Sequence, residues 1–274
     1  MPFLILAYVA VALIALGVFL TAPSMRRRAV RPFLSVPFAH RGLHGDGVAE
    51  NSLTAFRRAA DMGYGMELDV RVSRDGEVVV LHDPTLARVA GDERAVRDMT
   101  AEELSRVSLG GTADGVPRLC DVLRVVDGRT PILIEIKEES ASDGDVVTPL
   151  LSLLSSYKGP ILIESFNPLV LGRVRRRAPH IVRGLLCDWY KDRRGLRYRL
   201  LERFLLNFIA RPQFIAYCHT AVHILPFRML CALYRPSLFA WTVRSPEEER
   251  TARAAGFDAV IFEHYRPKDE KETV

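Results

Sequence analysis

Short apolar runs alternate with helix-like stretches from residue 36 onward, and this alternation restricts the fold more than any other feature. The runs predict eight strands, at 36–39, 65–70, 131–136, 160–164, 181–186, 213–217, 238–243 and 258–262. The stretches between them predict helices, including 52–62, 119–127, 145–156, 168–177 and 246–255. Eight strands separated by helices favour an α/β fold, a parallel (β/α)8 TIM barrel over residues 36–266.

A doubly wound parallel sheet is the main competing fold. No G-x-G-x-x-G or P-loop motif follows the first predicted strand, which disfavours this alternative. Residues 84–117 are longer than an ordinary connection, so we interpret them as a small insertion after the second strand. Residues 267–274 are expected to form a polar tail.

The first 24 residues predict a membrane anchor. Residues 3–22 carry no charge and are long enough to cross a bilayer as one helix. A cleaved signal peptide is disfavoured, because no basic residue precedes the apolar run and Pro23 follows it. Four arginines lie in the next stretch, a predicted basic linker at 25–35, so the positive-inside rule places the remainder on the cytoplasmic side. The four dispersed cysteines fit a reducing compartment.

The charge is unevenly distributed along the chain. The net charge of +5 includes 12 basic and three acidic residues within 173–211. One interpretation of 193–211 is an outer barrel helix, and the other is an amphipathic helix that lies on anionic lipid. The long acidic stretch at 35–172 argues against a nucleic-acid-binding protein.

Carboxylates gather on two of the predicted strands. Glu67 and Asp69 are two residues apart and therefore face the same side of their strand, as do Glu135 and Lys137 on theirs. In one barrel, the three carboxylates would converge and repel one another unless a cation lies between them. Oxygen ligands favour one divalent cation, Mg²⁺ or Ca²⁺. The alternative to a metal site is that the charged side chains on each strand are exposed or form salt bridges.

Two histidines follow apolar strands. His40 and His82 are each followed by turn-forming residues, so both are expected at the barrel mouth. Imidazoles beside a metal are suited to serve as general acid and general base. Arg41 offers a planar donor fork for phosphate, and Lys137 a fixed positive charge.

The combined motifs resemble the glycerophosphodiester phosphodiesterase family. They are His40-Arg41-Gly42, Glu50-Asn51-Ser52, Glu67-Leu68-Asp69, His82-Asp83-Pro84 and Glu135-Ile136-Lys137, followed by Ile163-Glu164-Ser165-Phe166-Asn167 and Trp241-Thr242-Val243. The resemblance covers residues 36–262. Two positions depart from the family pattern: Ala49 replaces the usual proline, and the last strand ends in Glu263-His264 and lacks the usual threonine-aspartate.

The resemblance implies a TIM barrel and a site. Glu67, Asp69 and Glu135 would bind the metal, His40 and His82 would be the acid/base pair, Arg41 and Lys137 would contact the phosphate, Trp241 would line the substrate pocket, and Glu50 and Asn51 would support the site. The implied reaction is cleavage of a phosphodiester into an alcohol and a phosphomonoester. The nucleophile would be water or a neighbouring substrate hydroxyl, and the roles of the two histidines stay open.

Three functions remain in competition at this stage. The first is metal-dependent hydrolysis of glycerophosphodiesters to an alcohol and glycerol 3-phosphate at the membrane, with lysophospholipase D-like cleavage of lysophospholipids as a variant. The second is a catalytically silent, membrane-tethered binding module, which the complete set of histidines and carboxylates disfavours. The third is a phospholipase C of the phosphatidylinositol type.

Overall fold

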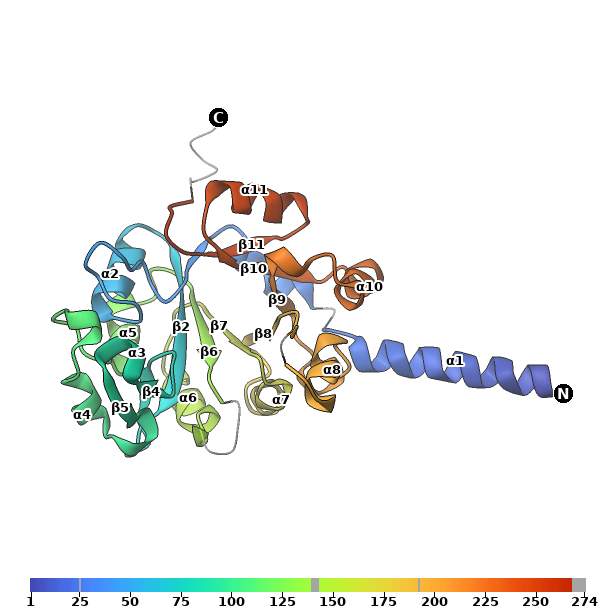
Figure 1. The fold of residues 1–274 in the computed structure, drawn as a ribbon, viewed down its shortest axis with the longest axis horizontal. Helices are drawn as coiled ribbons and strands as arrows, with labels where there is room; N and C mark the ends of the chain where they lie inside the picture. Colours follow the sequence, from blue (N-terminus) through green and yellow to red (C-terminus); the bar gives the residue numbers. More distant parts are fainter. Residues whose placement is uncertain (25, 139–142, 192, 268–274) are drawn as a thin grey trace.

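The structure is a computed structural model that describes residues 1–24, 26–138, 143–191 and 193–267 (Figure 1). Eight parallel strands close into a barrel: β1 (Phe38–Ala39), β2 (Gly65–Val72), β6 (Ile132–Ile136), β7 (Ile161–Ser165), β8 (Val182–Cys187), β9 (Phe214–Cys218), β10 (Ser237–Val243) and β11 (Ala259–Phe262). Strand β1 pairs with both β11 and β2, which closes the ring. The predicted (β/α)8 barrel is confirmed, and each predicted strand is present.

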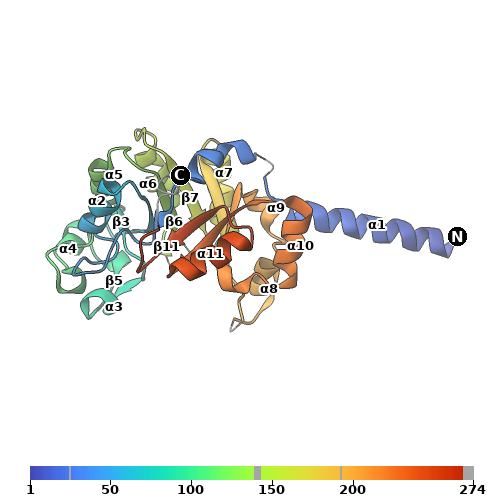
Figure 2. The ribbon, with the colours of Figure 1, turned by 90° about the horizontal axis from the view of Figure 1, so that it is seen from above.

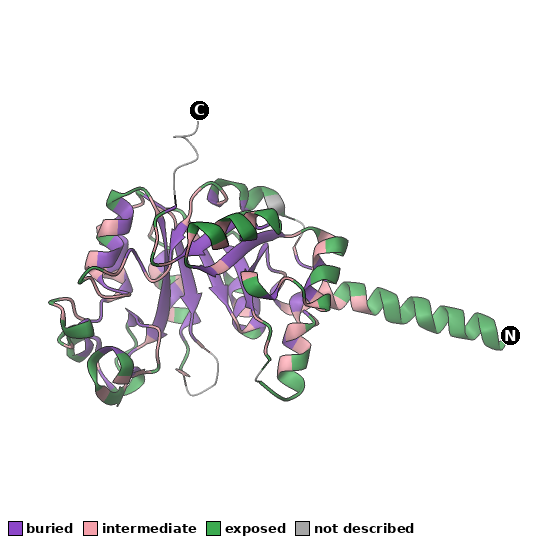
Figure 3. Ribbon diagram, turned by 45° about the horizontal axis from the view of Figure 1, so that its top comes forward, coloured by how far each residue is buried: buried purple, intermediate pink, exposed green. Residues whose placement is uncertain are grey.

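Helices surround the barrel. They are α2 (Leu53–Asp61), α5 (Leu119–Val126), α6 (Val147–Leu154), α7 (Pro168–Arg177), α8 (Leu196–Glu202), α9 (Asn207–Ala210), α10 (Leu225–Tyr234) and α11 (Pro246–Ala254). Ser52 caps α2 and Ser245 caps α11, each by accepting a backbone N–H three residues ahead. The strands are buried and the outer faces of the helices are exposed (Figure 3).

The barrel interior below the mouth is filled with apolar side chains. Phe38, Phe214 and Phe239 pack there against leucines and valines of the other strands. Gly184 makes room for this packing, because a Cβ atom at that position would lie 2.1 Å from the ring of Phe214. The interior is therefore a packed core, and any site lies at its mouth.

Residues that precede the first strand form the floor of this core. Two short 3₁₀ turns, Arg27–Ala29 and Arg31–Phe33, follow the apolar N-terminal segment. Val30 is fully buried and Phe33 nearly so, and both belong to the interior cluster. The stretch predicted as the basic linker 25–35 is thus in part a structural element of the barrel. The expected polar tail lies outside the described residues, apart from Pro267.

A small insertion follows β2. Strand β3 (Val78–Val80) pairs antiparallel with the end of β2, and β4 (Thr85–Leu86), α3 (Ala87–Ala90), β5 (Asp92–Ala95) and α4 (Ala101–Ser105) follow. Val79, Leu81, Leu86 and Leu104 belong to a separate apolar cluster that holds the insertion together. The insertion predicted after the second strand is present, and β3 extends it toward the barrel.

Helix α1 (Pro2–Thr21) projects away from the barrel (Figures 1 and 2). Its mean hydropathy is 2.9 and none of its apolar window is buried, so one helix is long and apolar enough to cross a membrane. Its last turn contacts the barrel: the hydroxyls of Thr21 and Tyr234 lie 2.9 Å apart, and the rings of Phe19 and Phe208 are 5.9 Å apart. The root of α1 is thus joined to α9 and α10.

The second basic stretch differs from the expected single helix. Phe204 has a φ of 57° between α8 and α9, so the helical path is broken there. Asn207 is buried and donates to the backbone oxygen of Thr21, and Arg211 donates to the backbone oxygen of Ala22. These two residues therefore do not share an exposed face with Arg199, because they fasten the barrel to the root of α1.

Candidate active site

The turn after β1 places His40 and Arg41 at the barrel mouth. Arg41 has a φ of 56° and Gly42 a φ of 80°. A Cβ atom on Gly42 would lie 2.8 Å from that of Ala55, so this turn requires glycine. The backbone N–H of Arg41 donates to Oε2 of Glu67 over 3.0 Å, which ties the turn to β2.

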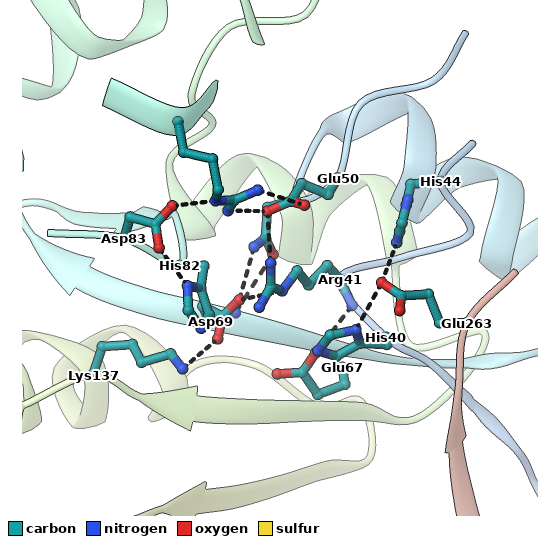
Figure 4. Close-up of polar contacts among 12 residues, drawn as sticks. His40, Arg41, His44, Glu50, Glu67, Asp69, His82, Asp83, Lys137 and Glu263 are labelled. Carbon is teal, nitrogen blue, oxygen red and sulfur yellow. Dashed lines mark hydrogen bonds and ion pairs between the residues drawn. The ribbon is translucent and has the colours of Figure 1, made fainter. Parts of the chain in front are cut away.

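Three carboxylates converge at the mouth, and Figure 4 shows two of them, Glu67 and Asp69. Glu67, Asp69 and Glu135 are all buried, and each offers one oxygen such that these oxygens lie within 4.8 Å of one another. Asp69 of β2 and Glu135 of β6 are direct neighbours in the strand register. The convergence predicted from the sequence is therefore present, and three buried oxygen ligands within this distance fit a hard divalent cation.

Two cations lie against this cluster. Nζ of Lys137 is 2.8 Å from Oε1 of Glu135 and 3.1 Å from Oδ1 of Asp69. Nε of Arg41 is 3.5 Å from Oδ2 of Asp69, and the same oxygen accepts from the side chain of Asn51 over 2.8 Å. These contacts make Asp69 the best-compensated member of the cluster.

The protonation of the three carboxyls reflects this difference. Burial and the neighbouring carboxylates raise the pKa of Glu67 well above its usual range. Burial raises the pKa of Glu135 to about 7 against the opposing effect of Lys137. The charges of Lys137, His82 and Arg41 outweigh burial at Asp69 and hold the pKa of that carboxyl far below its usual range. A further positive charge would favour ionisation of Glu67 and Glu135, so the donor set fits a metal.

Each of the two histidines is held by a carboxylate through Nδ1. His40 Nδ1 lies 3.2 Å from Oε1 of Glu263, and His82 Nδ1 lies 2.7 Å from Oδ1 of Asp83. Because an ionised carboxylate only accepts, Nδ1 carries the proton in the neutral ring and Nε2 keeps its lone pair. Burial lowers the pKa of both histidines, and their carboxylate partners oppose this effect.

A chain of ion pairs connects these groups across the mouth. Arg88 of the insertion donates to Asp83 over 2.6 Å and to Glu50 over 2.6 Å. Glu50 also accepts from Arg41 over 2.8 Å. Glu50 and Asn51 therefore support the mouth from the loop before α2. His82 enters from the end of β3, so the insertion carries one of the two histidines.

Three of these charged residues, Asp83, Arg88 and Glu263, have no assigned role in the sequence prediction. Glu263 immediately follows β11, which pairs with β1, so its position beside His40 follows from barrel closure. Asp83 was visible as the neighbour of His82. No sequence signal identifies Arg88.

Three more side chains lie inside the mouth. The rings of Trp241 on β10 and Phe166 just after β7 meet edge to face with centroids 5.6 Å apart. Glu164 of β7 is 1% exposed and pairs in register with Glu135, and its Oε2 has no hydrogen-bond partner among the described residues. Burial and the nearby Glu67 and Glu135 raise the pKa of Glu164 well above its usual range. Sequence reasoning assigned no role to this fourth carboxyl group.

Comparison with known proteins identifies relatives of this chain. The glycerophosphodiester phosphodiesterase of Caldanaerobacter subterraneus subsp. tengcongensis is 30% identical over 239 residues, or 81% of this chain and 91% of that protein. A solved glycerophosphodiester phosphodiesterase from Thermotoga maritima has a TM-score of 0.64 at 29% identity, covering 83% of this chain and 93% of that one. A human lysophospholipase D is 35% identical over 115 residues, or 42% of this chain and 36% of that protein.

A family model also matches most of the chain. The model of the glycerophosphoryl diester phosphodiesterase family matches residues 40–266, from the first histidine of the mouth to the residue before the described chain ends. The chain therefore belongs to the glycerophosphoryl diester phosphodiesterase family and is a glycerophosphodiester phosphodiesterase.

Proposed function

We propose that this enzyme uses one divalent cation, Mg²⁺ or Ca²⁺, to hydrolyse glycerophosphodiesters into an alcohol and glycerol 3-phosphate. The observation that carries the proposal is the cluster of Glu67, Asp69 and Glu135 at a mouth that also holds His40 and His82. The three carboxylates would hold the metal. When bound, the cation would stabilise negative charge that develops on the phosphoryl oxygens.

The two histidines supply the proton transfers. One Nε2 takes a proton from the attacking hydroxyl while the other, protonated, donates to the leaving oxygen. Asp83 and Glu263 orient the rings through Nδ1 and stabilise the imidazolium form of each. Attack by water yields glycerol 3-phosphate directly, whereas attack by the adjacent glycerol hydroxyl yields a cyclic phosphate that water then opens.

Arg41 and Lys137 bind the phosphate in this proposal. Both already face the carboxylate cluster, and a substrate phosphate beside the metal would share their donors. Trp241 and Phe166 would pack against the apolar carbons of the alcohol or glycerol portion. Glu50 and Asn51 keep Arg41 and Asp69 in place through the hydrogen bonds described above.

The test is an assay of the full chain in neutral detergent with glycerophosphocholine and glycerophosphoglycerol. We expect activity with Mg²⁺ or Ca²⁺, loss of activity in chelator, and recovery on adding metal. Phosphorus NMR of the reaction distinguishes the two nucleophiles by the presence of a cyclic phosphate. Full activity in chelator would contradict the metal role.

A lysophospholipase D-like activity is the second candidate, and one observation favours it. A groove of about 750 Å³ between α7 and the α8–α9 segment is lined mainly by apolar side chains, with Leu169, Leu201 and Ile209 among them. Glu138 and Asn167, which follow β6 and β7 at the mouth, also line this groove. This groove is suited to the acyl chain of a lysophospholipid. Leu201→Glu should lower the rate with lysophosphatidylcholine more than the rate with glycerophosphocholine. If the variant changes neither rate relative to the wild type, this use of the groove is contradicted.

Membrane attachment through α1 completes the proposal. Both ribbon views show α8 and α10 beside the root of α1, at the end of the molecule remote from the insertion. Leu225, Met229 and Leu233 recur every four residues on α10 and are 65%, 54% and 60% exposed. This stripe lies beside the segment 193–211, for which lipid contact was one of two interpretations, and we propose that both rest on the bilayer surface with the barrel on the cytoplasmic side.

Two measurements address this attachment. Binding to anionic vesicles is measured for a chain that lacks residues 1–24 and for its variant with Arg193, Arg194, Arg197 and Arg199 changed to glutamine. We expect weaker vesicle binding by the variant, and unchanged binding would refute a lipid role for the segment. Protease protection of the full chain in sealed vesicles of known orientation determines which side holds the barrel.

A further inference from the structure

A pocket lined by arginines lies at the junction of α1 and the barrel, remote from the mouth. Its volume is about 380 Å³, and its lining residues are Pro23, Ser24, Arg26, Arg175, Pro179, Arg183, Arg211 and Gln213. Four guanidinium groups thus face one pocket, with no carboxylate among the lining residues. The end of α7, the start of β8 and the segment after α9 contribute the arginines, together with the chain just after α1.

Arg183 is the buried member of this group. It is 6% exposed, its Nε donates to the backbone oxygen of Ala210 over 3.0 Å, and its Nη2 donates to that of Arg211 over 3.3 Å. Its Nη1 is buried and has no hydrogen-bond partner among the described residues. Burial and the like charges of Arg175 and Arg26 lower the pKa of Arg183 to about 10, so it remains a cation at neutral pH.

Capping of α9 explains part of this arrangement. Arg175 donates to the backbone oxygens of Phe208 and Ile209, which are among the last carbonyls of that short helix. Carbonyl groups carry only partial charges, so they do not neutralise a guanidinium. The four arginines of the pocket therefore have no counterion among the lining residues. An unpaired charged donor that is buried costs free energy, so the vacant donor of Arg183 indicates a ligand with a full negative charge.

The pocket lies where the apolar helix ends. The guanidinium of Arg211 lies over the ring of Phe19, 4.9 Å from its centroid, and Nη1 of Arg211 donates to the oxygen of Ala22 over 3.0 Å. The backbone N–H of Ser24 donates to the oxygen of Pro212 over 2.7 Å. If α1 spans a bilayer as proposed above, this level coincides with the phosphates of the lipid headgroups.

We propose that this pocket binds the phosphate of an anionic membrane lipid, with Arg183 as the buried donor and Arg26, Arg175 and Arg211 around it. Arginine is suited to this task because its planar fork makes two hydrogen bonds to one phosphate. The inference rests on the proposed retention of α1 in the membrane. It assigns a lipid-binding site that is separate from the catalytic mouth.

Native mass spectrometry of the full chain in neutral detergent tests the proposal. The intact mass shows whether α1 is retained, and short-chain phosphatidylglycerol, short-chain phosphatidylcholine and inorganic phosphate are titrated separately. We expect one phosphatidylglycerol to bind at least about tenfold more tightly than phosphatidylcholine, which is the contribution of a single charge-assisted hydrogen bond. We also expect the pair of changes Arg26→Gln and Arg175→Gln to remove this preference.

Two kinds of variant separate loss of the lipid site from loss of the fold. Arg26 and Arg175 are exposed, so their replacement does not disturb the core, whereas Arg183→Gln is examined only if it folds. Arg57→Gln on α2 removes one positive charge far from α1 and is expected to bind lipid like the wild type. Equal binding of both lipids, or equal effects of Arg57→Gln and the double change, would overturn the site.

Free phosphate is the other source of the same chemistry. If inorganic phosphate competes with phosphatidylglycerol at similar concentrations, the lipid assignment is wrong and the pocket is a general phosphate site. Phosphodiester hydrolysis by the wild-type preparation is measured in parallel. A chain that hydrolyses its substrate but shows no lipid preference overturns this inference alone, and a chain that binds lipid but does not hydrolyse overturns the proposed function alone.

Discussion

The Nδ1 atom of His40 lies 3.2 Å from Oε1 of Glu263, so a residue after the first strand of the barrel is paired with a residue after the last. Glu263 also lies 3.2 Å from Nε2 of His44 and 3.0 Å from Nε of Arg244. The hydrogen bonds from His40 and His44 outweigh burial and hold the pKa of Glu263 far below its usual range, so it is an anion at every pH at which His40 titrates.

Replacing Glu263 with glutamine should shift the titration of His40. The carboxylate favours the imidazolium, so its loss lowers the pKa of His40. The limb of the pH–rate profile that reports His40 should therefore move to lower pH, by about one unit for one charge-assisted hydrogen bond. The profile of kcat/KM measures this shift, with Glu247→Gln on the exposed face of α11 as the control. An unmoved limb would mean that His40 is not the group observed.

Replacing Glu135 with glutamine should weaken metal binding. The change removes one of the three carboxylates of the cluster. Lys137 then keeps Asp69 as its anionic neighbour. Loss of a partner outside the ligand shell typically costs 10–100-fold in metal affinity, so loss of a direct ligand should cost at least about 100-fold. Isothermal titration with Mg²⁺ and Ca²⁺ measures the affinity, and Glu102→Gln on α4 is the matched control. Equal affinities in the two variants would place the metal elsewhere.

Replacing His82 with alanine should lower kcat by about 10²–10⁴-fold, which is the usual contribution of a positioned acid or base. Asp83→Asn should have a smaller effect, because the ring keeps a neighbour of the same size but loses the charge that favours its protonation. Metal affinity should remain within about twofold in both variants. His180→Ala, an exposed histidine on the connection after α7, should leave kcat unchanged. A parallel loss of metal affinity would argue that His82 acts as a ligand.

Replacing Glu164 with glutamine should stabilise the metal-free protein in a pH-dependent way. The raised pKa means that the folded state keeps its proton while the unfolded state ionises above about pH 4.5, so this group destabilises the fold increasingly as the pH rises. The gain in melting temperature from the variant should accordingly be larger at pH 8 than at pH 5. In a chain of this size, about 2–4 °C corresponds to 1 kcal/mol. The melting temperatures are measured in chelator. Equal gains in melting temperature at pH 5 and pH 8 would contradict a raised pKa of Glu164 in the folded state.

Much of the barrel could be predicted because strand periodicity and helix caps are local signals. All eight barrel strands and the carboxylates of β2 and β6 follow from alternation along single segments. The break between α8 and α9 was missed because 196–211 is amphipathic throughout. Only contact with the root of α1 decides that Asn207 turns inward.

Contacts between distant segments account for the site residues that had no predicted role. Arg88 contacts Glu50 across the mouth, and nothing in the insertion sequence indicates this partner. Glu164 belongs to the site because β7 pairs with β6 in a register that sets it beside Glu135. Such registers depend on how the whole ring closes, which no short motif encodes.

The floor of the barrel has a consequence for how this enzyme can be released or engineered. Val30 and Phe33 fill the lower end of the interior only a few residues after α1 ends. A protease that cut the chain after Phe33 would remove both α1 and part of the packed interior, so release of an active enzyme by a cut at that point is incompatible with this fold. If α1 is retained in a membrane as proposed, the enzyme would search for substrate in two dimensions, and its turnover would depend on the surface density of substrate in the bilayer.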